Sequence, residues 1–299
     1  MSSSEAAAAV AARASYRLGI LLVTASAVAW STTGFFTRLI PLDTGTLLFW
    51  RGLFGGLGIL IFIVLQQRRN TVRSFRAMGR PAWSFAIVSA LGMLCFISSL
   101  RMTTVAHVAI IYATVPFIAA GLAWLVMRER PTARAAVASL AALLGVGIMV
   151  GLGGDGSWLG DLLALGMTMA MAVMMVISRR FQGIAVMQAA CLSTFLSAAI
   201  AMPFAANLAV SVHDLVNLAM FGIVNSSLGL VLFTLGARML PAVETGLIGS
   251  LDAPLAPIWV WLVFAETPTA VTLIGGLIVF TAVAAHILAG SHRGPIETA

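Results

Sequence analysis

The chain has 299 residues, of which 61% are apolar and only 9% are charged, with a net charge of +7. A soluble domain carries about 25% charged residues, so this composition excludes a water-soluble protein and predicts one domain embedded in a lipid bilayer. All 17 basic residues are Arg. We interpret them as the basic bias of cytoplasmic loops, and we expect no nucleic-acid partner.

Ten apolar windows follow one another along the chain. A helix of roughly 20 apolar residues crosses a bilayer, and each window is about that long. The sequence therefore predicts an all-α integral membrane protein with ten transmembrane helices, over residues 18–39, 46–65, 82–100, 104–127, 133–151, 158–178, 186–206, 215–237, 243–265 and 269–289.

The arginines predict the orientation of these helices. If the N-terminus is cytoplasmic, fourteen Arg residues fall inside, Arg38 and Arg101 fall outside, and Arg51 lies within the second helix. Basic residues collect in short cytoplasmic loops. An even number of helices then returns the C-terminus to the cytoplasm, so we expect cytoplasmic tails at residues 1–17 and 290–299.

An internal repeat relates the two halves at an offset of 137 residues. Trp124-Leu125-Val126 matches Trp261-Leu262-Val263, and the turn that begins at Glu129 matches the turn at Glu266. Each half, 18–151 and 152–289, then carries five helices, and the odd number inverts the second half. Inverted repeats are typical of secondary carriers, whose substrates bind near the midplane. We expect both glutamates to brace the next helix or to pair with an Arg.

Several tracts resemble the drug/metabolite transporter superfamily, in particular its EamA-type carriers. Ser99 to Ala106 is similar to their loop between the third and fourth helices, Pro116 and Glu129 fit their Pro–thirteen–Glu pattern, and Gly145-Val146-Gly147 resembles their fifth helix. The resemblance implies a basket of ten helices around a central cavity, with the fifth and tenth helices at the periphery. Overall, the chain is most similar to bacterial YddG-type exporters of aromatic amino acids, which implies the bacterial inner membrane.

One tract departs from that pattern, because Ala253 stands where the second Pro is expected and Pro254 and Pro257 follow. Two prolines three residues apart are expected to kink the ninth helix. Asp252 lies beside them, and a charge at this depth usually faces a cavity. We interpret Asp252 as a substrate or proton-coupling residue, and Glu244 as a gate or coupling residue; the alternatives are a bond to freed carbonyls for Asp252 and a favourable helix-N-terminal charge for Glu244.

Other polar and aromatic residues are candidates for the cavity wall. Polar breaks occur in the first and eighth helices, aromatic side chains suit a pocket for an aromatic ligand, and a His can titrate near neutral pH. Structural roles in helix packing remain the alternative for all of them. The candidates are Trp30, Ser31, Thr33, Phe96, His107, Tyr112, Asn225 and Ser227.

Small residues predict close helix contacts. Gly52 with Gly56, and Gly147 with Gly151, fit the small-xxx-small pattern of membrane helix interfaces. We interpret these four glycines as structural.

The leading hypothesis is a carrier that exports aromatic and other neutral amino acids by alternating access, as a monomer, with coupling to protons left open. A multidrug carrier of organic cations would use Asp252, whereas a nucleotide-sugar carrier would need basic residues in the cavity, and only Arg51 lies within a span. A membrane enzyme is the remote alternative, because there is no Gly-x-Ser-x-Gly motif and no His pair with metal-ligand spacing. We expect no cofactor and no metal.

Overall fold

The structure is a computed structural model that describes residues 3–128, 133–152, 156–181, 183–240, 245, 248–249 and 251–291. All secondary structure in these residues is helical. The helices are α1 (Ser3–Ser31), α2 (Thr33–Leu39), α3 (Thr44–Gln67), η1 (Arg68–Asn70), α4 (Thr71–Arg76), α5 (Arg80–Met102), α6 (Val105–Tyr112), α7 (Val115–Met127), α8 (Ala133–Leu152), α9 (Trp158–Arg180), α10 (Val186–Ala201), η2 (Met202–Phe204), α11 (Val212–Met220), η3 (Phe221–Leu228), α12 (Gly229–Gly236), α14 (Asp252–Phe264) and α15 (Ala270–Ser291).

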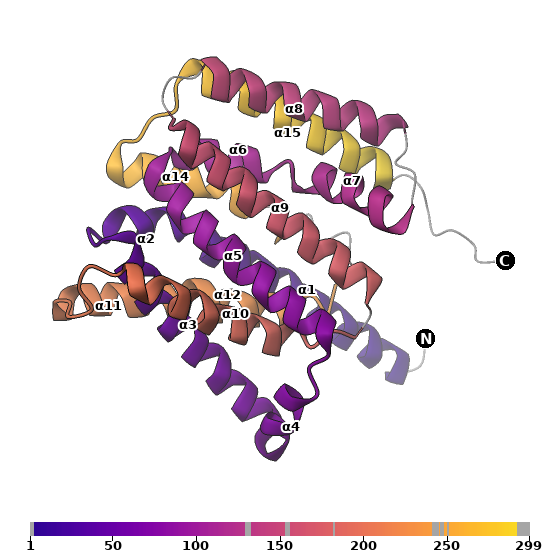
Figure 1. Cartoon of the computed structure of the whole chain (residues 1–299). Coiled ribbons are helices and arrows are strands. Elements are labelled where there is room, and N and C mark those ends of the chain that lie inside the picture. The colour runs from indigo at the N-terminus through magenta and orange to yellow at the C-terminus, as the bar shows by residue number, and fades with distance from the viewer. Residues whose placement is uncertain are drawn as a thin grey trace.

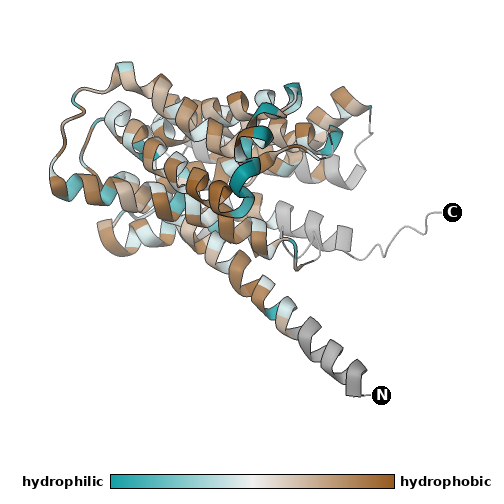
Figure 2. Cartoon of the chain, turned by 90° about the horizontal axis from the view of Figure 1, so that it is seen from below, coloured by the Kyte–Doolittle hydropathy of each residue, from teal (hydrophilic) through white to brown (hydrophobic). Residues whose placement is uncertain are grey.

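Seven described segments are long and apolar enough to cross a membrane. They cover Ala14–Leu39, Thr44–Arg76, Arg80–Met102, Val105–Met127, Trp158–Arg180, Val186–Phe204 and Val212–Gly236, and two shorter apolar helices follow at Leu255–Phe264 and Ala270–Ala282. Figure 2 shows apolar residues along most of the helices, and large side chains such as Leu65 and Leu125 are more than 70% exposed. The protein is therefore a multi-pass membrane protein. The expected fifth helix falls on α8, and the expected ninth begins outside the described residues, so the count of ten stays a prediction.

Several crossings are interrupted near their middle. The first breaks at Thr32, between α1 and α2, where the hydroxyls of Ser31, Thr32 and Thr33 donate to Val28 O, Ala29 O and Trp30 O. Such back-bonding bends helices. The eighth crossing contains the π-helical segment η3, and π-helical turns often occur at functional sites. The polar breaks expected in both crossings thus coincide with irregular backbone.

The internal repeat is visible in the helix boundaries. The bounds of α7 and α14 differ by 137 residues at both ends, and α8 and α15 begin 137 residues apart. The residues that end α7 and α14, Arg128 and Ala265, are both left-handed, with φ of 57° and 54°. A left-handed residue is a common way to end a helix. The offset found in the sequence therefore corresponds to repeated backbone geometry.

Helix packing repeats as well. The helices α5 and α9 pack together, as do α1 and α12, and the pair α10 and α5 has its counterpart in α3 and η3. The fifth and tenth expected helices, α8 and α15, run side by side at one edge of the molecule (Figure 1). Each contact between the halves is matched by the one that exchange of the two repeats would give.

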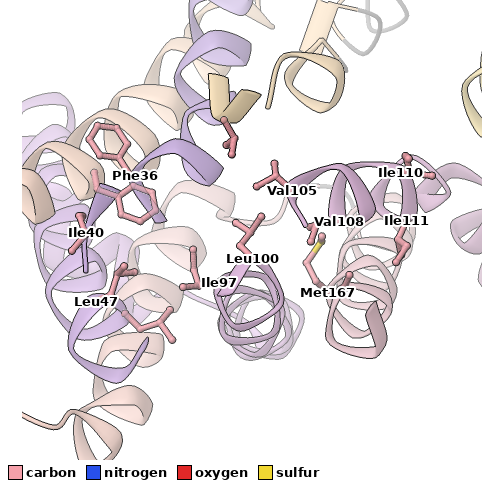
Figure 3. Packing of buried hydrophobic residues seen from close by; sticks show 14 of the residues in the cluster. Phe36, Ile40, Leu47, Ile97, Leu100, Val105, Val108, Ile110, Ile111 and Met167 are labelled. Carbon is pink, nitrogen blue, oxygen red and sulfur yellow. The ribbon is translucent and has the colours of Figure 1, made fainter. Parts of the chain in front are cut away.

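The main apolar core joins the two halves. Phe36 and Phe221 stack at 5.2 Å between ring centroids, and Leu100, Val108 and Met167 continue the cluster (Figure 3). Burial of one such side chain contributes about 1.5–3 kcal/mol in water, although lipid offers a smaller gain. This core holds α2, α3, α5, α6, α9 and η3 around the centre of the molecule.

Glycines allow α3 to approach α10 closely. A Cβ on Gly52 would lie 2.6 Å from Thr194 O, and one on Gly56 would lie 2.8 Å from the Phe195 ring. The predicted packing role of these two residues is confirmed. For Gly147 it is wrong, because a Cβ there would meet no atom within 4 Å; Gly145 makes the close approach of α8 to α15 instead. The side-chain surroundings of Gly151 lie outside what the structure describes.

Candidate functional site

A cavity of about 320 Å³ lies between the two halves. Pockets for small molecules are mostly apolar with a few convergent polar groups, and this one fits. Its walls carry Phe85, Phe96 and Tyr112 and three methionines of α9. Helices α1–α3, α5, α6, α9, α10, α12, α14 and η3 contribute lining residues, whereas none of the described residues of α8 or α15 does.

Arg51 is the single basic side chain among the described lining residues. It lies on α3 and is 1% exposed. Its Nη2 donates to Asn225 Oδ1 at 2.8 Å, and its guanidinium carbon lies 4.7 Å from the centre of the Phe221 ring. Its Nε has no hydrogen-bond partner among the described residues. A buried cation with one neutral hydrogen bond retains much of its desolvation cost.

Asn225 fixes the position of Arg51. Its Nδ2 donates to Thr33 Oγ1 at 2.6 Å and contacts Ala29 O and Trp30 O at 3.1 and 3.2 Å. These acceptors are the carbonyls and hydroxyl at the break between α1 and α2. With its amide nitrogen held there, the Asn225 carbonyl oxygen can face only Arg51. The irregular segments of the first and eighth crossings are thus joined through one side chain.

Asp252 is the single acidic side chain among the described lining residues. It is half-buried and is the first residue of α14, which begins inside the expected ninth helix. Tyr112, the last residue of α6, lines the same cavity, and α6 packs against α14. The cavity therefore has one positive and one negative group within an aromatic and aliphatic wall.

One end of the cavity is sealed by an ion pair between α2 and the segment after α14. Arg38 Nε and Glu266 Oε2 lie 2.9 Å apart. Arg38 also donates to Leu100 O at 2.6 Å and Thr103 O at 3.0 Å, and Glu266 accepts from the Val105 N–H. The pair ties together the first, third, fourth and ninth crossings.

The opposite end of the cavity approaches the end of the bundle that carries α4. Lining residues reach Phe85, in the second turn of α5, and Val186, the first residue of α10. Figure 1 shows α4 at this end and α2 and α11 at the other. The cavity thus extends away from the Arg38–Glu266 seal.

Comparison with known proteins agrees with this architecture. The model of the EamA-like transporter family matches the chain twice, over residues 17–151 and 158–288. The chain belongs to the EamA-like transporter family. A crystal structure described only as that of a protein overlays with a TM-score of 0.65 at 18% identity, covering 93% of this chain and 99% of that one. The comparison with curated proteins gave no match.

Membership of the EamA family makes the chain a membrane transporter of small molecules, which is not the activity of an enzyme. It also places two family repeats where the sequence predicted them. The predicted pairing of Glu266 with an Arg is confirmed by its contact with Arg38, whereas Glu129 lies outside the described residues.

Six of the residues predicted for the substrate site line the cavity of this EamA-family protein. They come from five different crossings, which only the fold brings together. These residues are Trp30, Thr33, Phe96, Tyr112, Asn225 and Asp252.

Three other candidates lie outside the lining. Ser31 accepts a hydrogen bond from Trp259 Nε1 at 2.8 Å, and Ser227 donates to Gly55 O at 2.8 Å. Both hydroxyls join helices, which is the packing alternative considered for them. Ser226, which the sequence did not single out, lines the cavity instead, and its hydroxyl is buried with no partner among the described residues. Glu244 lies outside the described residues.

His107 is held in a separate buried network. Its Nδ1 lies 3.0 Å from Asp161 Oδ1, its Nε2 lies 3.3 Å from Thr272 Oγ1, and Thr103 donates to the same Asp161 oxygen. A Cβ on Gly156 would lie 2.5 Å from the His107 ring. This network joins α6, α9 and α15, so its geometry favours the structural alternative for His107.

Arg51 is the main residue whose role the sequence did not predict. It stood alone within an apolar window, which was the available signal, since charges at membrane depth are rare and usually functional. Its lack of a charged partner was not visible, because Asn225 and Phe221 lie some 170 residues along the chain.

Proposed function

We propose that this EamA-family protein is a ten-helix carrier that exports small amphipathic metabolites, namely aromatic and other neutral amino acids, by alternating access. The observation that carries the proposal is the central cavity, which combines a single cation and a single anion with an apolar wall. A neutral amino acid has the same combination of groups.

The wall favours bulky apolar side chains. Trp30, Phe85, Phe96 and Tyr112 offer flat surfaces, and ring pairs gain about 0.5–1.5 kcal/mol beyond the burial of their area. Met167, Met171 and Met174 add an adaptable surface, because methionine is flexible and polarizable. Such a wall suits several neutral side chains rather than one.

Alternating access is supported by the matched packing of the two halves. If the repeats are inverted, exchange of their conformations opens the end that is now sealed and closes the other. The Arg38–Glu266 pair lies at the end that the arginine distribution assigns to the outside. The described conformation is then inward-facing, with the cavity reached from the cytoplasm of a bacterial inner-membrane protein.

The alternatives fit the cavity less well. A nucleotide sugar carries two phosphate charges, and the lining offers one Arg. An organic cation would suit Asp252 and the aromatic wall, but it would leave Arg51 buried without an anion. Asp252 remains the group best placed to carry a coupling proton.

Counterflow into proteoliposomes tests the proposal. Vesicles containing the purified protein and unlabelled phenylalanine should accumulate labelled phenylalanine, leucine or methionine above protein-free vesicles. A matched control is Gly34→Trp, which fills the cavity wall where a Cβ would already lie 2.9 Å from Val105. Absence of uptake across a broad panel of amino acids, with organic cations accumulated instead, would sink the assignment.

A further inference from the structure

We infer that Arg51 and Ser226 form an anion subsite in the cavity, which binds the carboxylate of the transported substrate, and that Asn225 positions it. The inference rests on the proposed function and deepens it, since it states which end of the molecule is recognised and where. It starts from hydrogen-bond donors that the protein leaves unused.

The first unused donors belong to Arg51. A guanidinium offers five N–H groups in a planar fork that matches a carboxylate. The described residues take one of them, at Asn225 Oδ1, and leave Nε without a partner. No described acidic side chain lies within ion-pair distance of Arg51. Its neighbour on the other face is the Phe221 ring, which attracts a cation but does not neutralise it.

The second unused donor is the hydroxyl of Ser226. It is buried, lines the same cavity and has no hydrogen-bond partner among the described residues. Other described serines and threonines near mid-helix return their hydroxyl to a carbonyl of the preceding turn, as Ser31 and Thr194 do. Buried polar groups are almost always paired. Two unpaired donors that face one cavity therefore indicate a missing acceptor.

The local backbone presents both donors to one place. Gly55 lies one turn after Arg51 on α3, and a Cβ there would lie 2.7 Å from Ser226 Cβ. Gly222 allows the same crossing from the other side, because a Cβ there would lie 2.7 Å from Arg51 O. The crossing of α3 with η3 thus brings the backbone at Arg51 close to the π-helical turn that carries Asn225 and Ser226.

The chemistry selects a monoanion. A single cation with one added hydroxyl can neutralise one negative charge, and the remaining wall is apolar apart from Asp252 and a few hydroxyls. A planar carboxylate accepts paired N–H bonds from an Arg fork, and charge-assisted bonds of this kind are about twice as strong as neutral ones. Asp252 then remains for an ammonium group, and a substrate without a carboxylate loses the Arg51 contact.

Binding to the purified full-length protein tests the inference independently of transport. Quenching of tryptophan fluorescence reports ligands near Trp30, which lines the cavity. We expect 3-phenylpropionate, which keeps the carboxylate alone, to bind at least tenfold more tightly than phenylalaninamide, which keeps the ammonium alone. Arg51→Gln should abolish this preference, and Arg51→Lys should restore part of it. Equal affinity of both ligands for the wild-type protein would overturn the anion subsite while leaving amino-acid transport standing.

A neighbouring pair of serines supplies a variant that does not threaten the fold. Ser226→Ala should weaken 3-phenylpropionate several-fold without lowering the melting temperature, because its hydroxyl bonds to no described residue. Ser227→Ala, one position along the same segment, should lower the melting temperature without changing the affinity, because its hydroxyl bonds to Gly55 O. Unchanged affinity in Ser226→Ala, or equal losses in both variants, would contradict the assignment.

Discussion

Single buried polar residues organise the centre of this protein. Asn225 spends its amide nitrogen on the α1–α2 break and its carbonyl oxygen on Arg51, so one side chain connects the two halves. In an apolar interior an unpaired polar group is costly. The residue is therefore both a structural and a positioning element.

Asn225→Leu is expected to destabilise the protein by about 1–3 kcal/mol, because a hydrogen bond to a charged group is lost. It should also weaken carboxylate binding, because Arg51 loses its orientation. Thermal unfolding in detergent and fluorescence titration measure the two effects. Asn217→Ala on exposed α11 is the control and should change neither. Full stability of Asn225→Leu would contradict the proposed role.

Asp252→Asn separates binding from coupling. If Asp252 carries the coupling proton, the variant should lose stimulation by a pH gradient and retain counterflow exchange of phenylalanine. His107→Gln is the comparison, and we expect it to retain gradient stimulation, because His107 bonds to Asp161 and Thr272 outside the cavity lining. Undiminished gradient stimulation in Asp252→Asn would rule out the coupling role.

The helices and their order could be read from the sequence because each crossing has its own apolar length. The repeat was also readable, since α7 and α14 share aligned Trp and turn residues. The half-helix that starts at Asp252 was expected as a proline kink, whereas the break precedes Pro257 and matches the one between α6 and α7. Contacts such as Arg51 with Asn225 depend on how crossings pack, which a local pattern does not specify.

The close crossing of α3 and α10 depends on glycine. Gly52→Ala places a methyl group against the Thr194 carbonyl oxygen, which belongs to rigid backbone. Overpacking of this kind costs about 1–3 kcal/mol, so the melting temperature should fall. Gly121→Ala is the matched control, since a Cβ there meets no atom within 4 Å, and it should keep or raise stability. A similar response of both variants would show that the crossing is loose.

The start of α3 gives a prediction for pH. Partial burial raises the pKa of Asp43, but hydrogen bonds from the Thr46 hydroxyl, the Thr46 N–H and the Ala206 N–H outweigh it and lower the pKa below its usual 3.8. A lowered folded-state pKa adds stability above pH 3.8 that is lost as pH falls through the folded value.

Asp43→Ala should therefore cost about 1 kcal/mol at pH 7, the usual cost of losing a helix N-cap. The difference from the wild type should shrink below pH 3.8. Thermal unfolding in detergent at both pH values measures it. A difference independent of pH would show that the carboxylate charge is not involved.

At the scale of the whole molecule, the account requires one cavity that opens to each side in turn. The described state has its seal at one end, where Arg38 and Glu266 join both halves. The two halves repeat the same helix pairings, so the sealed and unsealed ends can exchange. Transport then follows from the breaking of one seal and the making of its counterpart.

Accessibility of the cavity from each side tests this claim most directly. Val108→Cys, in a background with Cys95 and Cys191 replaced by Ala, places a thiol in the lining. An impermeant thiol reagent should label it from the cytoplasmic side, and labelling from the outside should be slow. Arg38→Gln should increase outside labelling at least several-fold, and excess phenylalanine should protect the thiol from both sides. Equal labelling from both sides in the parent protein, or no effect of Arg38→Gln, would contradict alternating access about this cavity.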